Sequence, residues 1–305
     1  MLAALIAAVT ITFPQPGAKL PHLEKCYMSG AVGRGVTNLV VQGKAVDIYR
    51  TGAWVTMLDL VDGTNTVEVV AGGETTNHVF NVAAKPAAPG ATAPEKPYEK
   101  LPYAAESPLP HPNGKPPAET TIWLDPGHGG NDTGTLSPHG FPEKDANLRV
   151  AREVKKALEE KGYRVAMTRD SDVALELYDR PRKAHEEKAD AFVSIHHNAP
   201  GFGSDPRKVR YHAVYSWNAV GASLAAFVNA RMAETLEGDI PNKGALHANF
   251  AVTRSPEIPS CLVEVDFITT PQGEEDAWCH PRRRAIGRAI ADGIDDWRRA
   301  ACRPF

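Results

Sequence analysis

The chain has 305 residues, 42% of them hydrophobic and 23% charged, and a formal net charge of -3 at pH 7. This composition is typical of a globular protein and leaves room for two domains. The balanced charge argues against a nucleic-acid partner, and no apolar run is long enough to span a membrane.

The N-terminus and the cysteines leave two questions open. Residues 1–8 are apolar and alanine-rich, but they lack the positive segment and the longer apolar run of a signal peptide. They are either a clipped signal segment or an ordinary strand.

The four cysteines form no C-x-x-C pair, which argues against a cysteine-rich zinc site, while a disulfide between two of the last three stays open. They are Cys26, Cys261, Cys279 and Cys302.

Residues 9–82 have the pattern of short β-strands separated by turns. Strand-like segments flank the turns at residues 42–44 and 62–65, so each turn predicts a hairpin. Short strands at this spacing predict a small all-β sandwich. The segment around Trp54 resembles bacterial immunoglobulin-like modules attached to secreted enzymes. Because no catalytic cluster occurs here, we expect residues 1–82 to form an immunoglobulin-like spacer or docking module.

Residues 83–118 are rich in proline and alanine. Such a composition favours extended, semi-rigid conformations over a packed core. We therefore expect a linker here, followed by a second domain over residues 119–305.

Strands and helices alternate in the second domain. The expected strands are residues 121–124, 163–168, 191–195, 209–216 and 259–265, and the expected helices are residues 144–161, 179–189, 219–236 and 281–300. This alternation predicts an α/β fold, with a mainly parallel twisted sheet covered by helices on both faces.

A glycine-rich turn follows the first of these strands and carries His128, in the sequence Asp125-Pro126-Gly127-His128-Gly129-Gly130. Glycines let a backbone approach a bound group closely. The end of a strand is also where open α/β sheets place their ligands. We interpret His128 as a metal ligand.

Three more residues complete a candidate site: Glu143 at the start of a helix, His196 at the end of a strand, and Glu264 inside an apolar strand. Two histidines and one carboxylate are a typical catalytic zinc set, and a second carboxylate can act as general base. Composition leaves open which glutamate has which role. Glu264 is the strongest anomaly, because an unpaired charge is costly to bury. His197 is expected to point away from His196, since neighbours on a strand face opposite sides.

These segments resemble the zinc-dependent N-acetylmuramoyl-L-alanine amidases of the AmiC-like type. The similarity covers roughly residues 121–297, and its motifs are residues 124–130, 143–144, 194–199 and 262–268. Two departures are His197, where the family often has a small residue, and Asp266, where a glycine is common.

The resemblance implies specific roles. His128, Glu143 and His196 would hold Zn²⁺, and Glu264 would be the general base and later the proton donor to the leaving amine. The substrate would be the amide between N-acetylmuramic acid and L-alanine of the stem peptide in peptidoglycan. We therefore expect an extracytoplasmic monomer, in the periplasm or cell wall, and leave an activator protein open.

Three other functions compete with this one. A zinc carboxypeptidase uses the same ligand types but needs an arginine for the free carboxylate of its substrate. A catalytically silent wall-binding module has no reason to keep a general base. A glycosidase with two carboxylates leaves both histidines unexplained.

Overall fold

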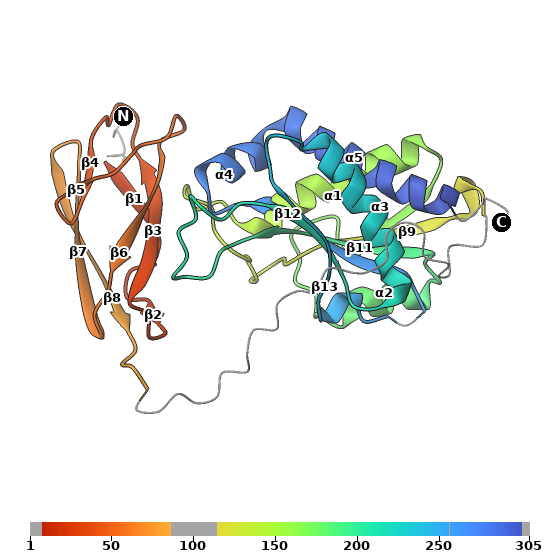
Figure 1. Cartoon of the computed structure of the whole chain (residues 1–305), viewed down its shortest axis with the longest axis horizontal. Coiled ribbons are helices and arrows are strands. Elements are labelled where there is room, and N and C mark those ends of the chain that lie inside the picture. Colours follow the sequence, from red (N-terminus) through yellow and green to blue (C-terminus); the bar gives the residue numbers. More distant parts are fainter. Residues whose placement is uncertain (1–7, 87–114, 256, 301–305) are drawn as a thin grey trace.

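The structure is a computed structural model that describes residues 8–86, 115–255 and 257–300. An all-β N-terminal part lies beside a larger α/β part (Figure 1). The possible signal segment, most of the expected linker and Cys302 lie outside the described residues.

The N-terminal part, called here the β module, consists of two sheets packed around one core. Their orders are β1(Val9–Phe13)-β3(Lys25–Val32)-β6(Ala53–Asp59) and β2(Lys19–Leu20)-β8(Glu74–Val82)-β7(Gly63–Ala71)-β4(Leu39–Val41)-β5(Lys44–Ala45). Met28 and Trp54 from the first sheet pack in one buried cluster with Val69 and Phe80 from the second. Burial of these large side chains against each other is what holds the two sheets together.

One of the two predicted hairpins is confirmed and the other is wrong. β4 and β5 pair as expected around the turn at residues 42–44. β6 and β7, however, lie in different sheets. Asn65 holds the connection between them, because its amide accepts the N–H of Val61 at 3.0 Å and donates to the carbonyl of Val61 at 2.7 Å. A short polar turn between two strands of alternating hydrophobicity can join strands of one hairpin or strands of two different sheets in a sandwich. The sequence pattern alone does not distinguish the two.

The α/β part is built on one six-stranded sheet. Its order is β10(Arg164–Met167)-β9(Thr121–Pro126)-β11(Ala191–Asn198)-β14(Ser260–Phe267)-β12(His212–Ser216)-β13(Asn242–His247). Four neighbouring pairs are parallel, but β12 and β14 are antiparallel, so the sheet is mixed. The segment that joins β11 to β12 holds no helix. An antiparallel return needs no crossover helix, whereas a parallel one usually does.

Helices cover both faces of the sheet, as predicted. One face packs against α1(Glu143–Glu160), α3(Ala219–Thr235) and α5(His280–Ala300), through the apolar strand residues that include Leu124 and Val193. The other face, with Trp123 and Phe192, packs against α2(Asp179–Glu186) and η2(Ala251–Thr253). Figure 1 shows α1, α3 and α5 together on one side and α2 on the other.

Several elements were not predicted from the sequence. They are the strands β2, β3, β8 and β13, the 3-10 helices η1(Pro117–Glu119) and η2, and the short helix α4(Pro271–Trp278). α5 packs very closely on its neighbours, because a β-carbon at Gly293 would lie 2.5 Å from the Cα of Val228 in α3. Among the described residues, Cys26, Cys261 and Cys279 are free thiols. None of the described helices is both long enough and apolar enough to cross a membrane.

Candidate metal centre

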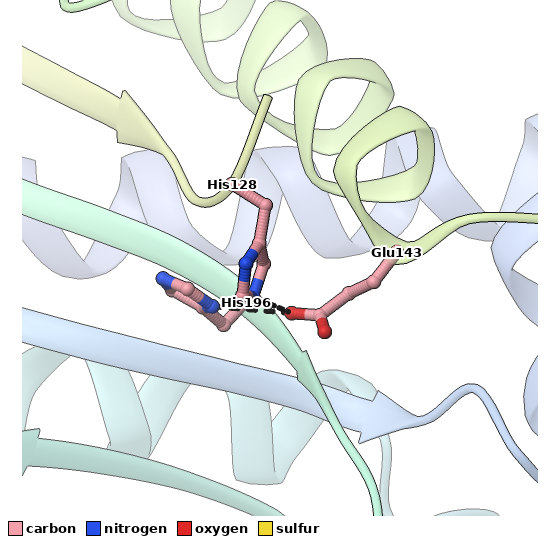
Figure 2. A group of neighbouring side chains, drawn as sticks. All are labelled: His128, Glu143 and His196. Carbon is pink, nitrogen blue, oxygen red and sulfur yellow. Dashed lines mark hydrogen bonds and ion pairs between the residues drawn. The ribbon is translucent and has the colours of Figure 1, made fainter. Parts of the chain in front are cut away.

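Three of the predicted site residues converge at the ends of two neighbouring strands. His128 follows β9, His196 lies near the end of β11, and Glu143 is the first residue of α1. One possible ligand atom from each of the three lies within 4.8 Å of the other two. Figure 2 shows the two imidazoles and the carboxylate pointing toward one another. β9 and β11 are parallel neighbours, so their carboxyl ends meet at the same edge of the sheet.

The glycines of the site make this convergence possible. A β-carbon at Gly127 would lie 2.1 Å from the ring of His196, and one at Gly134 would lie 2.6 Å from Oε2 of Glu143. His128 itself has a positive φ of 63°, which is uncommon for a residue other than glycine. The turn is therefore shaped to bring the imidazole of His128 over Glu143.

Two buried arginines hold the turn in place. Arg180 is ion-paired with the buried carboxylate of Asp125 at 2.9 Å and donates to the carbonyl of His128 at 2.8 Å. Arg169 donates to the carbonyls of Pro126 and Gly127, both at 2.9 Å. A buried ion pair is tolerated when its remaining hydrogen bonds are satisfied. Both arginines lie within the residues that resemble the amidases, but their role in holding the turn was not predicted from the sequence.

Glu143 is almost fully buried and its carboxylate is surrounded by donors. Its Oε1 accepts the backbone N–H of His197 and the amide of Asn147, both at 3.1 Å, and its Oε2 accepts the N–H of Thr135 at 3.1 Å. Oε1 also lies 3.1 Å from Nδ1 of His196 and 3.3 Å from Nε2 of His128. Burial would raise the pKa of Glu143, but the hydrogen bonds and charges of the two histidines outweigh it and hold that pKa well below its usual value. The group is therefore an ionised carboxylate.

His128 is oriented by Asp132, a residue that the sequence analysis missed. Nδ1 of His128 lies 2.8 Å from Oδ2 of Asp132, and the Oδ1 of that carboxylate accepts the N–H of Gly134 at 3.1 Å. Nδ1 therefore carries the proton, and Nε2 is the atom that faces Glu143. Burial opposes protonation of this ring, but Glu143 and Asp132 together raise the pKa of His128 to about 9. A histidine that binds a metal through one ring nitrogen commonly donates the N–H of the other nitrogen to a carboxylate.

His197 points away from His196, as expected for neighbours on a strand. It is buried, and its Nδ1 donates to Oδ1 of Asn147 at 2.8 Å. The amide of Asn147 is thereby turned so that its N–H groups face Glu143 and the carbonyl of Gly127. Burial lowers the pKa of His197 to about 4. This neutral imidazole therefore acts on Glu143 indirectly, because it orients the amide of Asn147 that donates to the carboxylate.

Glu264 lies in β14 directly beside His196, its partner in the β11/β14 register. It borders a cavity of about 430 Å³ together with His128 and His196. Its Oε2 atom is buried and has no hydrogen-bond partner among the described residues. Burial raises the pKa of Glu264 well above its usual value, and the charge of Glu143 adds to the rise. An acidic group whose Oε2 atom has no partner among the described residues therefore borders the cavity.

Glu264 and Phe250 also border a second cavity of about 380 Å³. Its other lining residues include Ala199, Pro200, Gly201 and Ser204, which follow β11. Glu264 therefore lines two cavities, the one that it shares with His128 and His196 and this second one. Asp266, the second departure from the family pattern, is buried and ion-paired with Arg210 at 2.6 Å.

The donor set fits a Zn²⁺ ion. Two imidazole nitrogens and one carboxylate oxygen are ligands that zinc prefers, and three protein ligands leave one position open for water or substrate. The two glycine positions described above leave no room for a side chain beside these donors. The unpartnered Oε2 of Glu264 is a group that a bound water or substrate would satisfy.

A sequence profile described as N-acetylmuramoyl-L-alanine amidase matches residues 122–296, more than half of the chain. The amidase AmiC of Neisseria meningitidis serogroup B is 35% identical over 229 residues, which cover 60% of this chain and 53% of AmiC. A probable cell wall amidase LytH of Staphylococcus saprophyticus is 34% identical, with 60% of each chain covered. The chain thus spans less than two thirds of the length of these two relatives.

Solved structures agree with the sequence comparison. The amidase AmiC2 of Nostoc punctiforme superposes with a TM-score of 0.55 and 33% identity, over 58% of this chain and 96% of that one. An amidase from Clostridium difficile 630 gives a TM-score of 0.55 and 30% identity, over 59% of this chain and 97% of that one. On the profile match and these relatives, the chain belongs to the N-acetylmuramoyl-L-alanine amidase family.

Proposed function

We propose that this chain is a zinc-dependent peptidoglycan amidase. It hydrolyses the amide bond between N-acetylmuramic acid and L-alanine of the stem peptide, and so separates stem peptides from the glycan strand. The family and the names of its relatives support this reaction. The observation that carries the proposal is the buried Oε2 atom of Glu264, which has no hydrogen-bond partner in the part of the chain that the structure describes, beside the cluster of His128, Glu143 and His196.

The residues of the site have separate roles in this reaction. His128 through Nε2, Glu143 and His196 would hold the ion, and Asp132 would fix the orientation of His128. Zinc bound there would polarise the scissile carbonyl and lower the pKa of a water molecule toward 7. Glu264 would take a proton from the attacking water and deliver it to the nitrogen of the leaving L-alanine. Hydrolysis then yields a lactyl carboxylate and a free amino terminus.

We further propose the domain organisation that the sequence suggests. Residues 1–82 form an immunoglobulin-like module, residues 83–118 a linker, and residues 119–305 the catalytic domain. The two packed sheets that end with β8 and the α/β elements that follow η1 support this division. The substrate places the protein outside the cytoplasm, and we propose that it acts there as a monomer.

Metal analysis combined with digestion of purified peptidoglycan tests the function. We expect about one zinc per chain, release of L-alanine amino termini, and no new reducing sugar. His128→Ala should lose both the metal and the activity. New reducing ends would instead indicate a glycosidase, and release of C-terminal amino acids a carboxypeptidase. A zinc-loaded chain that leaves peptidoglycan intact would overturn the proposal.

A further inference from the structure

The β module contacts the α/β part through its sheet of β1, β3 and β6. Figure 1 shows this module beside the end of the α/β part that carries α4. Three segments of the α/β part make the contacts: residues 137–141 before α1, residues 200–204 after β11, and α4 itself. The first two of these segments lie close to the candidate metal centre.

The first contact joins β3 to the segment after β11. The backbone N–H of Tyr27 donates to the carbonyl of Phe202 at 3.1 Å. The ring of Phe13 stacks on Phe202 with a centroid distance of 5.3 Å and on Tyr27 with one of 4.5 Å. Stacked rings stabilise a contact beyond the area that they bury. The β module therefore binds both the backbone and the side chain of Phe202.

That segment is also a wall of the substrate space. Pro200, Gly201 and Ser204 border the second cavity, which Glu264 also lines. A shift of Phe202 would displace the nearby residues Gly201 and Ser204. The shape of the cavity that they border would then change. The β module thus contacts the segment that limits the space next to the proposed base.

The second contact involves the segment before α1. The hydroxyl of Thr12, a buried residue of β1, donates to the carbonyl of Pro138 at 2.6 Å. Ser137 and His139 on either side bind Glu274 of α4 through hydrogen bonds of 2.5 to 2.9 Å. These bonds fix the middle of the segment between the β module and α4.

The same segment ends at a proposed zinc ligand. Thr135 donates its backbone N–H to Oε2 of Glu143 at 3.1 Å and accepts the N–H of Glu143 at 2.9 Å. Only two residues separate Thr135 from Pro138. A third contact, the exposed ion pair between Arg50 and Glu275 of α4, is expected to add little because solvent screens it.

We infer that the β module is a fixed part of the catalytic unit and holds two walls of the active-site cleft, rather than acting as a free spacer. It binds the segment that leads to Glu143 through Thr12, and the segment that borders the Glu264 cavity through Phe13 and Tyr27. Its effect on turnover rests on the proposed amidase function, whereas its docking does not.

Hydrogen exchange on the full chain tests the docking, because the amide of Tyr27 reports it directly. β1 pairs with β3 only as far as Ser29, and although β6 lies beside Tyr27, the N–H of Tyr27 donates to the carbonyl of Phe202. Phe202 therefore protects this amide. We expect this amide to be protected in the unmodified chain. It should exchange ~10-fold faster in the double variant Thr12→Val/Phe202→Ala, which removes a hydrogen bond and a stacked ring.

A matched control changes similar side chains on the other sheet. Thr75→Val/Val79→Ala alters two exposed residues of β8 and should leave the exchange of Tyr27 unchanged. Free exchange of Tyr27 in the unmodified chain would overturn the docking. Equal exchange in the double variant and the control would overturn the assigned contacts.

Kinetics with soluble peptidoglycan fragments tests the consequence for the cleft. The double variant should raise KM several-fold and keep its zinc, while the control matches the unmodified chain. Unchanged KM in the double variant, with faster exchange of Tyr27, would overturn the role of the module in the cleft. An unmodified chain without activity would refute the amidase proposal, and the exchange experiment would still decide the docking.

Discussion

Two glutamates lie at the metal centre in opposite surroundings, one at the start of α1 and one in the middle of β14. Glu143 accepts hydrogen bonds from three groups of the chain besides the two histidines. The Oε2 atom of Glu264 has no partner among the described residues. The two side chains are chemically identical, so their surroundings alone distinguish them.

This difference favours one assignment of the roles that composition leaves open. The hydrogen bonds and charges of His128 and His196 hold the pKa of Glu143 low and keep it ionised, as a metal ligand must be. Burial raises the pKa of Glu264, which suits a group that must hold and release a proton. Separation of two carboxyl pKa values by their environments is a common way to divide acid and base roles.

The largest expected effect comes from Glu264→Gln. The amide cannot take a proton from water, so the rate of peptidoglycan hydrolysis should fall by about 10²–10⁴-fold, while zinc content stays at the level of the unmodified chain. Metal analysis and release of L-alanine amino termini measure the two quantities. Glu237→Gln, just after the end of α3 and lining neither of the two cavities beside Glu264, is the control and should change neither. Loss of zinc in Glu264→Gln would reverse the roles of the two glutamates.

His212 of β12 is, like Glu264, a titratable group with a buried polar atom that has no partner in the part of the chain that the structure describes, but the ligands of the candidate metal centre do not include it. It is fully buried, and neither of its ring nitrogens has a partner among the described residues. Burial lowers the pKa of His212 to about 4, below the value of about 6.5 expected in the unfolded chain. Between these values only the unfolded chain takes up the proton, so this group makes stability fall as the pH drops from about 6.5 toward 4.

At pH 5 this linkage should cost about 2 kcal/mol relative to pH 7. Denaturant unfolding of His212→Leu at both pH values should show a pH dependence smaller by about that amount. The control is His185→Leu, because His185 is exposed. A pH dependence of His212→Leu equal to that of the control would show that His212 has a partner or is protonated in the folded chain.

Much of the α/β part could be predicted from the sequence because its signals are local. The apolar run before the glycine turn, and the helical spacing of Leu148, Ala151 and Val154, predict β9 and α1 to within two residues. The carboxylate in the apolar strand likewise indicated a special role for Glu264, because burying an unpaired charge is costly.

The remaining features depend on contacts between distant parts of the chain. The antiparallel direction of β12 is set by pairing with β14, about fifty residues further along. Arg180 and Asp125 are more than fifty residues apart, and nothing local in the sequence shows that they form a buried ion pair. Asp132 could have been found, because it lies four residues after His128 in the same turn.

A smaller effect is expected for Asp132→Asn. The neutral amide keeps the shape of Asp132 but removes the charge that orients His128, so zinc affinity should fall by about 10–100-fold. Competition with a chelator of known affinity measures this change. Asp172→Asn is a control in the neighbouring loop, where Asp172 binds Lys144 and the N–H of Gly130. Equal zinc affinity of the two variants would show that Asp132 does not support the metal ligand.

The smallest effect is expected on the buried side of Glu143. His197→Leu removes the donor to Asn147, so the amide of Asn147 loses its orientation toward Glu143. The loss of one neutral hydrogen bond of about 1 kcal/mol should lower zinc affinity by about fivefold. His197→Gln keeps a donor and should recover most of that loss in the same chelator competition. If glutamine and leucine lower the affinity equally, His197 contributes only packing, and its hydrogen bond to Asn147 does not support the metal ligand Glu143.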